Sequence, residues 1–153
     1  MLPDINRDAK EQAVKTDHII ALISKTGEKA NAFILMKLKE LGIEGLAPSH
    51  GDILVNLFRS SPLPMKELAE RIGRDKSTIT ALINKLIKLG YVEKQRDPSD
   101  SRVTLIGLTR GGEELKPDFE YVSAKLLATT FRGFSAEEKE LVVRLMDRIH
   151  GNF

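Results

Sequence analysis

One face of the segment from Lys76 to Leu89 combines short polar side chains with lysines. At about 100° per residue, the apolar residues of this segment fall on one side of a helix and the other side carries no Asp or Glu. The outer face and its flanks consist of Ser77, Thr80, Ala81, Asn84, Lys85 and Lys88. Such side chains suit a helix in the major groove of DNA, where short polar groups meet base edges and lysines meet phosphates. A face exposed only to water is the alternative.

A second basic feature follows, where Arg96 and Arg102 flank a turn rich in Asp, Pro and Ser. An arginine placed in this way can enter the narrow minor groove of DNA, whose negative potential attracts it. Asp97 and Asp100 are expected to brace the turn, either by accepting hydrogen bonds within it or by pairing with Arg102. An ordinary surface hairpin with a weak ion pair is the alternative interpretation.

Residues for catalysis or metal binding are not arranged for either role. The chain has no cysteine, which excludes disulfides, thiolate metal sites and thiol nucleophiles. His18, His50 and His150 lie in separate segments, with no Asp or Glu at metal-ligand spacing. Lys76-Ser77 does not end a phosphate-binding loop, because the glycines of that motif are missing. We therefore expect neither an enzyme nor a cofactor.

The two basic features are positioned by the pattern of a winged helix-turn-helix. Two prolines within three residues end the preceding helix just before this module begins. Apolar spacing predicts a short helix over 65–72, a turn at 73–75 and a second helix over 76–89. The apolar period then changes to about two, which predicts a β-hairpin over 91–108.

Longer helices flank this module. Helical spacing predicts a first helix over 17–41, and Ser49 is expected to cap the next one. Thr109 is expected to cap a single long helix that continues toward Thr130, and Ser135 begins a capping box for the last helix. The expected fold is mainly α with a small β-hairpin wing. Apolar stripes on the first and last helices exceed what one small lobe can cover, which predicts a dimer.

Composition and charge agree with a single-domain DNA-binding protein. The 153 residues are 41% hydrophobic, enough for one ordinary domain. The net charge is only +2, but residues 65–110 hold ten Lys or Arg against six Asp or Glu, a local charge of +4. No apolar run approaches the roughly 20 residues of a membrane-spanning helix, so we expect no membrane partner and a cytoplasmic location.

The stretch from Leu68 to Leu115 closely resembles the winged helix-turn-helix of the MarR family of transcriptional regulators. The most specific part is the wing Arg96-Asp97-Pro98-Ser99-Asp100-Ser101-Arg102, followed by Leu105, Leu108, Thr109 and Gly112. The order and length of the helices extend the resemblance to nearly the whole chain. In this family a homodimer binds a palindromic operator in double-stranded DNA, with the recognition helix in the major groove and the wing arginine in the minor groove.

The resemblance implies an N-terminal dimerisation helix at 1–47, a DNA-binding lobe at 48–110 and C-terminal dimerisation helices at 111–153. Residue pattern and resemblance together assign DNA binding to Lys76, Ser77, Thr78, Thr80, Ala81, Asn84, Lys85, Lys88, Arg96, Asp100 and Arg102. Ala81 stands where many members carry a long basic side chain. This difference shifts the expected base readout to Ser77, Thr80 and Asn84.

The resemblance also implies a pocket between the dimer helices and the lobe for a small aromatic, often anionic, ligand. His50 is a candidate for that pocket, although a surface or capping role is the simpler interpretation. The expected function is therefore a repressor that such a ligand releases from DNA. Two alternatives stay open: a DNA-binding regulator without a ligand, and a winged-helix module for protein contacts.

Overall fold

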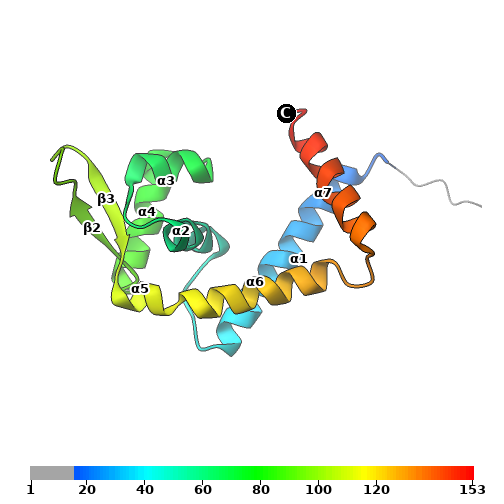
Figure 1. The fold of residues 1–153 in the computed structure, drawn as a ribbon, viewed down its shortest axis with the longest axis horizontal. Coiled ribbons are helices and arrows are strands. Elements are labelled where there is room, and N and C mark those ends of the chain that lie inside the picture. Colours follow the sequence, from blue (N-terminus) through cyan, green and yellow to red (C-terminus); the bar gives the residue numbers. More distant parts are fainter. Residues whose placement is uncertain (1–15) are drawn as a thin grey trace, which may run out of the picture.

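The computed structural model describes residues 16–153, which form a winged lobe joined to a group of outer helices (Figure 1). The helices are α1 (Ile19–Glu40), α2 (Pro48–Arg59), α3 (Met65–Ile72), α4 (Lys76–Lys88), α5 (Arg110–Glu114), α6 (Lys116–Thr130) and α7 (Ala136–His150). The strands are β1 (Leu63–Pro64), β2 (Val92–Arg96) and β3 (Thr104–Leu108). The mainly α fold with a β wing is confirmed. Residues 1–15 of the predicted N-terminal region lie outside the described part of the chain.

The core of the lobe lies where α2, α3 and α4 pack against the sheet. Ile53, Leu57, Ile79, Ile83 and Ile106 are fully buried in it. The helical members recur three or four residues apart, so each helix turns one apolar face inward. Full burial of each such side chain contributes about 1.5 to 3 kcal/mol, which fixes how each helix is rotated.

The wing belongs to a three-stranded antiparallel sheet with the order β1-β3-β2. Within it, Val92 pairs with Leu108 and Arg96 with Thr104, as expected for the hairpin. Strand β1 was not expected, because two residues are too short to show an alternating pattern. It forms through its contact with the middle of β3, where Leu63 pairs with Ile106.

The single long helix predicted from Arg110 to Thr130 is wrong, because the structure divides it into α5 and α6 at Leu115. Thr109 caps α5 as expected, with its side-chain oxygen accepting a hydrogen bond from the Gly112 amide at 3.1 Å. Pro117 has no amide hydrogen and therefore cannot continue the helical ladder, but it fits the first turn of a new helix.

The expected cap at Ser49 is also wrong. Helix α2 begins at Pro48, one residue earlier, and His50 supplies the cap: its Nδ1 accepts a hydrogen bond of 2.8 Å from the Ala47 amide. This histidine is 8% exposed, so the capping interpretation is confirmed and the surface one is not. Burial and, to a smaller extent, nearby Lys85 lower the pKa of His50, which favours the neutral ring that accepts this bond.

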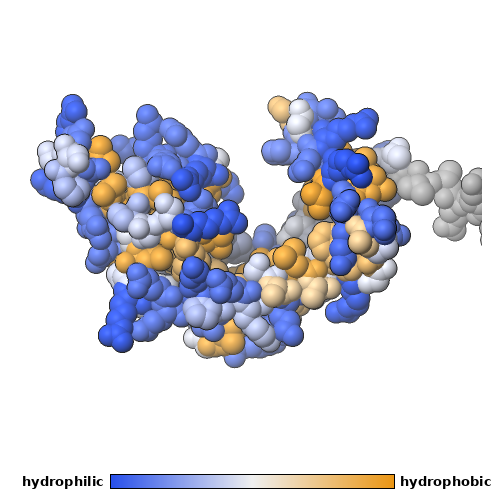
Figure 2. Space-filling view, viewed as in Figure 1, coloured by the Kyte–Doolittle hydropathy of each residue, from blue (hydrophilic) through white to orange (hydrophobic). Residues whose placement is uncertain are grey.

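The outer helices, α1, α6 and α7, expose apolar side chains that the described chain does not cover. Helix α6 leaves the lobe and contacts α1, and α7 follows at the far end (Figure 1). Figure 2 shows apolar surface in this outer part, away from the lobe. On α7, Leu141, Val142, Leu145 and Met146 are between 38% and 47% exposed. No helix within residues 16–153 has the length and apolar character needed to cross a membrane.

Two glycines provide a matched test of the packing between the wing and α5. A Cβ on Gly112 would lie 2.0 Å from the Tyr91 carbonyl oxygen, whereas a Cβ on Gly27 meets no atom within 4 Å. We expect Gly112→Ala to lower the free energy of unfolding by about 2 to 3 kcal/mol because backbone must move. Gly27→Ala is expected to raise it by about 0.5 to 1 kcal/mol, because alanine favours an exposed helix interior. Urea denaturation measures both, and equal effects of the two substitutions would contradict the close approach.

Candidate nucleic-acid interface

Helix α4 turns its polar face outward because its apolar face is anchored in the core. Ile79, Ile83 and Leu86 are fully buried, which leaves one rotation of the helix about its axis. The exposed residues predicted to bind DNA are Lys76, Ser77, Ala81, Asn84, Lys85 and Lys88, while Thr78 and Thr80 are half-buried. The outward face predicted from the sequence is therefore confirmed as a surface of the lobe.

Asp75 organises the N-terminal turn of α4. One of its carboxylate oxygens accepts hydrogen bonds from the Thr78 amide at 2.8 Å and the Ser77 hydroxyl at 2.6 Å. The other accepts from the Thr78 hydroxyl at 2.8 Å. The Ser77 hydroxyl is the largest cause of a pKa for Asp75 well below its usual range. Because the hydroxyl hydrogens of Ser77 and Thr78 are donated to Asp75, only the oxygen lone pairs remain to accept from another partner.

Thr80 faces α3 in addition to the outer surface. Its hydroxyl donates to the Lys76 carbonyl at 2.7 Å, and its oxygen lies 3.8 Å from the sulfur of Met65 on α3. The hydroxyl of Thr80 therefore bonds within its own helix, as threonine commonly does at this spacing.

Lys94 is a member of this surface that the sequence did not reveal. Its Nζ donates a hydrogen bond of 3.0 Å to Oδ1 of Asn84, which joins β2 to α4. The signal was available in the strand pattern, because alternate residues of a strand share a face. Val92 is buried in the core, so Lys94 and Arg96 share its side of the hairpin.

The tip of the wing holds Arg102 in a fork-like ion pair. Its Nε and Nη2 lie 3.0 Å from Oδ1 and Oδ2 of Asp100, and the Arg102 amide also donates to Asp100 at 3.0 Å. Asp97 accepts from the amides of Ser99 and Asp100. The predicted braces are thus confirmed. The Arg102 guanidinium lowers the pKa of Asp100, while the Arg102 side chain itself is 88% exposed.

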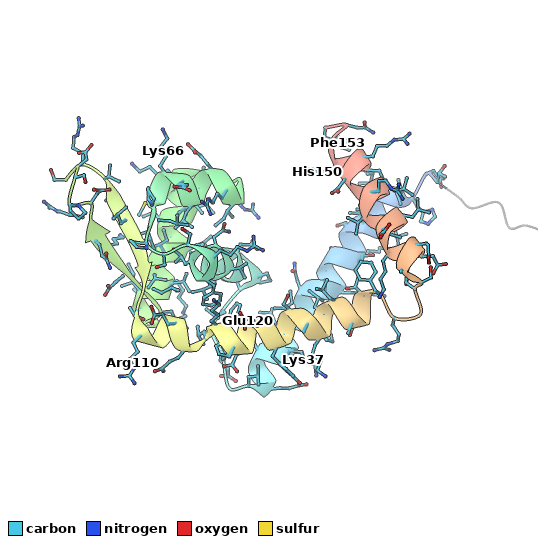
Figure 3. The ribbon with its side chains drawn as sticks, in the orientation of Figure 1. Lys37, Lys66, Arg110, Glu120, His150 and Phe153 are labelled. Carbon is cyan, nitrogen blue, oxygen red and sulfur yellow. The ribbon has the colours of Figure 1, made fainter. Side chains whose placement is uncertain are left out.

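A groove of about 690 Å³ separates α3 from the wing tip. Its border carries four basic residues, Lys66 on α3, Arg74 in the turn before α4, Lys76 on α4 and Arg102 on the wing, against one acidic residue, Glu70. Figure 3 shows Lys66 at the end of the lobe where the wing tip lies and Arg110 at the opposite end. Arg96 lies exposed at the end of β2, paired with Thr104. Phosphates are the ligands that such a basic, exposed surface favours.

The described residues offer little for other chemistry. Within residues 16–153 no three His, Asp or Glu side chains come together in a way that could hold a metal ion. His50 is occupied as a helix cap and does not line the cavity between α1, α2 and α6.

Comparison with known proteins identifies a family. The model of the MarR family matches residues 46–104, which contain α2 to the start of β3. The regulator SarZ of Staphylococcus aureus, described as an HTH-type transcriptional regulator, is 32% identical over 104 residues, 66% of this chain and 68% of SarZ. Residues 46–104, which the family model matches, include every residue of the candidate interface.

Solved structures extend the likeness to the outer helices. A MarR protein from Peptoclostridium difficile superposes with a TM-score of 0.79 at 25% identity, covering 92% of this chain and 90% of that one. A mutant MarR from E. coli in complex with operator DNA superposes with a TM-score of 0.76 at 20% identity, covering 88% and 98%. At 20% identity, the likeness to the E. coli protein is one of fold alone.

The role of Asp75 gives a pH-dependent prediction. Because the folded state lowers its pKa, the carboxylate stabilises the fold fully above its usual pKa of about 3.9 and loses this effect as pH falls toward the lower folded value. We expect Asp75→Ala to lower the free energy of unfolding at pH 7, with a difference from the wild type that shrinks below about pH 4. Urea denaturation across this range measures it. A difference that stays constant with pH would contradict the assignment.

Proposed function

Because this chain belongs to the MarR family of transcriptional regulators, we propose that it is a repressor that binds a palindromic operator as a homodimer. It is a DNA-binding regulator of transcription and not an enzyme. The observation that carries the proposal is the outward polar face of α4 beside a braced wing arginine. The operator DNA in the E. coli MarR complex supports DNA as the binding partner. Its work on operator DNA would take place in the cytoplasm.

We assign two roles to the residues of the interface. Short polar side chains near the start and middle of α4 read base edges in the major groove, while lysines hold phosphates. The base-reading group is Ser77, Thr78, Thr80 and Asn84, with apolar Ala81 on the same groove-facing surface; the phosphate group is Lys76, Lys85 and Lys88. Arg96 and Arg102 belong to the wing, with Arg102 in the minor groove and Asp100 as its brace.

Lys94 adds to this assignment by orienting the amide of Asn84. A lysine ammonium only donates, so the Asn84 atom facing it is the oxygen, and the amide nitrogen is left to face outward. An outward NH2 group donates to guanine N7 or O6, to adenine N7 and to thymine O4, whereas cytosine offers no acceptor. Asn84 is therefore assigned to a base other than cytosine. Because its oxygen is engaged by Lys94, it cannot make the bidentate contact by which a free asparagine selects adenine.

The wing assignment predicts that Arg102→Ala weakens operator binding about fivefold or more at physiological salt, since one inserted guanidinium is lost from each lobe. Arg110→Ala is the matched control, because it removes the same charge from α5 at the far end of the lobe (Figure 3). Fluorescence anisotropy with the selected operator measures both affinities. Equal affinities for the two variants would remove Arg102 from the interface.

Salt dependence separates DNA binding from the alternative of a protein-interaction module. Phosphate contacts release counterions, so the logarithm of the binding constant falls steeply with the logarithm of salt concentration. A module that used its winged lobe for protein contacts would bind duplex weakly at any salt.

The dimer is proposed from the unpartnered apolar faces of the outer helices. Apolar residues on α1 such as Ile20 and Leu22 are half or more exposed, and those on α7 are similarly uncovered. Exposed apolar area of this extent marks an interface, and a second copy supplies the same faces with two-fold symmetry. We therefore assign residues 1–47 and 111–153 to dimerisation and residues 48–110 to DNA binding.

The dimer interface can be tested with paired variants of α7. Replacing Leu145 and Met146 together by Gln is expected to give a monomer at micromolar concentration in sedimentation, because it removes two apolar contacts from each copy. Replacing Arg144 and Asp147 by Gln leaves the net charge unchanged and is expected to keep the dimer. A wild-type monomer, or a dimer in both variants, would contradict the proposal.

Release by a ligand is proposed at a cavity of about 180 Å³ between α1, α2 and α6. This position joins the two parts of the molecule, since α2 belongs to the lobe and α1 and α6 to the proposed dimerisation helices. A molecule bound there contacts both and changes the spacing of the two lobes. In the alternative of a regulator without ligand, occupation of the cavity leaves operator affinity unchanged.

A further inference from the structure

The cavity between α1, α2 and α6 has an apolar lining with a single charged side chain among residues 16–153, the carboxylate of Asp52. Leu38 and Val122 are the most buried of the apolar residues that line it, and Phe119 contributes a half-buried ring. The other polar side chains are Asn31 and Ser123, which are neutral. A small anion, expected from the family resemblance, would meet no cation here and one like charge.

The carboxylate of Asp52 is placed to receive a positive charge. Within the described chain no Lys, Arg or His lies within ion-pair distance of this carboxylate. The side-chain amide of Asn56 donates to the backbone carbonyl of Asp52 and not to its carboxylate. Asp52 is exposed to solvent on one side, but the atoms around it partly desolvate its carboxylate and raise its pKa, and the charge of Arg74 opposes this in part. A cation brought against the carboxylate relieves this cost.

We propose that the cavity takes a small apolar cation, with its ammonium group against Asp52 and its hydrocarbon part among the walls from α1 and α6. This inference rests on the proposed ligand-controlled function and names the chemical class of the ligand. The volume is sufficient for one aromatic ring, since a dry cavity of about 150 Å³ binds benzene. Phe119 offers its ring as an additional contact for the cation or the ligand's own ring.

Three probes of similar size separate charge from shape: the phenethylammonium ion, phenylacetate and 2-phenylethanol. Each is titrated into the full chain, and amide shifts of Gly51 and Val122 in two-dimensional NMR report binding at the cavity. We expect phenethylammonium to bind about fivefold or more tightly than phenylacetate, because Asp52 attracts the one and repels the other. The neutral alcohol is expected between the two.

The variant Asp52→Asn keeps the shape of the side chain and removes its charge. It is expected to reduce the preference for the ammonium probe to less than about twofold. Glu44→Gln is the matched control, because it removes one negative charge from the loop before α2 without touching the cavity. Stronger binding of phenylacetate, no binding of any probe, or an unchanged preference in Asp52→Asn would each overturn the proposal.

A second measurement separates this proposal from the proposed function. Operator affinity is determined with and without saturating phenethylammonium. A probe that binds with the expected Asp52 dependence but leaves DNA affinity unchanged supports the ligand class and contradicts ligand-controlled release. Release of operator by phenylacetate, with no binding preference for the ammonium probe, supports release and overturns the ligand class.

Discussion

Burial of one face of α4 determines which groups the winged lobe presents on its surface. Ile79, Ile83 and Leu86 are fully buried among α2, α3 and the sheet, so the helix cannot rotate without exposing them. The opposite face is therefore fixed outward without a dedicated contact of its own. Asp75 then fixes where the helix starts, and Lys94 fixes the direction of one amide. Each polar group is thus oriented by apolar packing first and by a local hydrogen bond second.

The same packing connects the wing to the outer helices. Thr109 follows the wing strand β3 and caps α5, and its hydroxyl donates to the carbonyl of Gly90, two residues after α4. Gly112 allows α5 to lie directly against the Tyr91 carbonyl. Helix α6 follows and forms one wall of the cavity that contains Asp52. The wing, α4 and the cavity between α1, α2 and α6 are therefore joined by a short and closely packed segment.

The sequence was sufficient for features that depend on local spacing. The polar face of α4, the braces of Asp97 and Asp100, and the caps at Thr109 and Ser135 all follow from residues within a few positions of one another. Features that need contacts far along the chain were missed. Strand β1 exists only because Leu63 meets Ile106, and Lys94 joins the interface only because β2 lies beside α4.

Two predictions from the sequence were wrong because a neighbouring residue took over the local role. His50, more buried than expected, took the capping role assigned to Ser49, and Pro117 divided a helix whose apolar spacing was continuous. The charged lining of the cavity could not be predicted from the sequence either. Asp52 lies on α2 and its apolar neighbours on α1 and α6, and no local spacing indicates that these residues meet.

Selection of bound duplexes from a random pool tests the central claim most directly. Two lobes related by two-fold symmetry are predicted to select an inverted repeat whose half-sites are centred about one helical turn apart. In each half-site, Asn84→Ala is predicted to remove the preference at one position, where the wild type disfavours C. Lys88→Ala is predicted to keep the selected sequence while lowering affinity for every duplex. Selection of no common sequence, or a change of sequence with Lys88→Ala, would contradict the account.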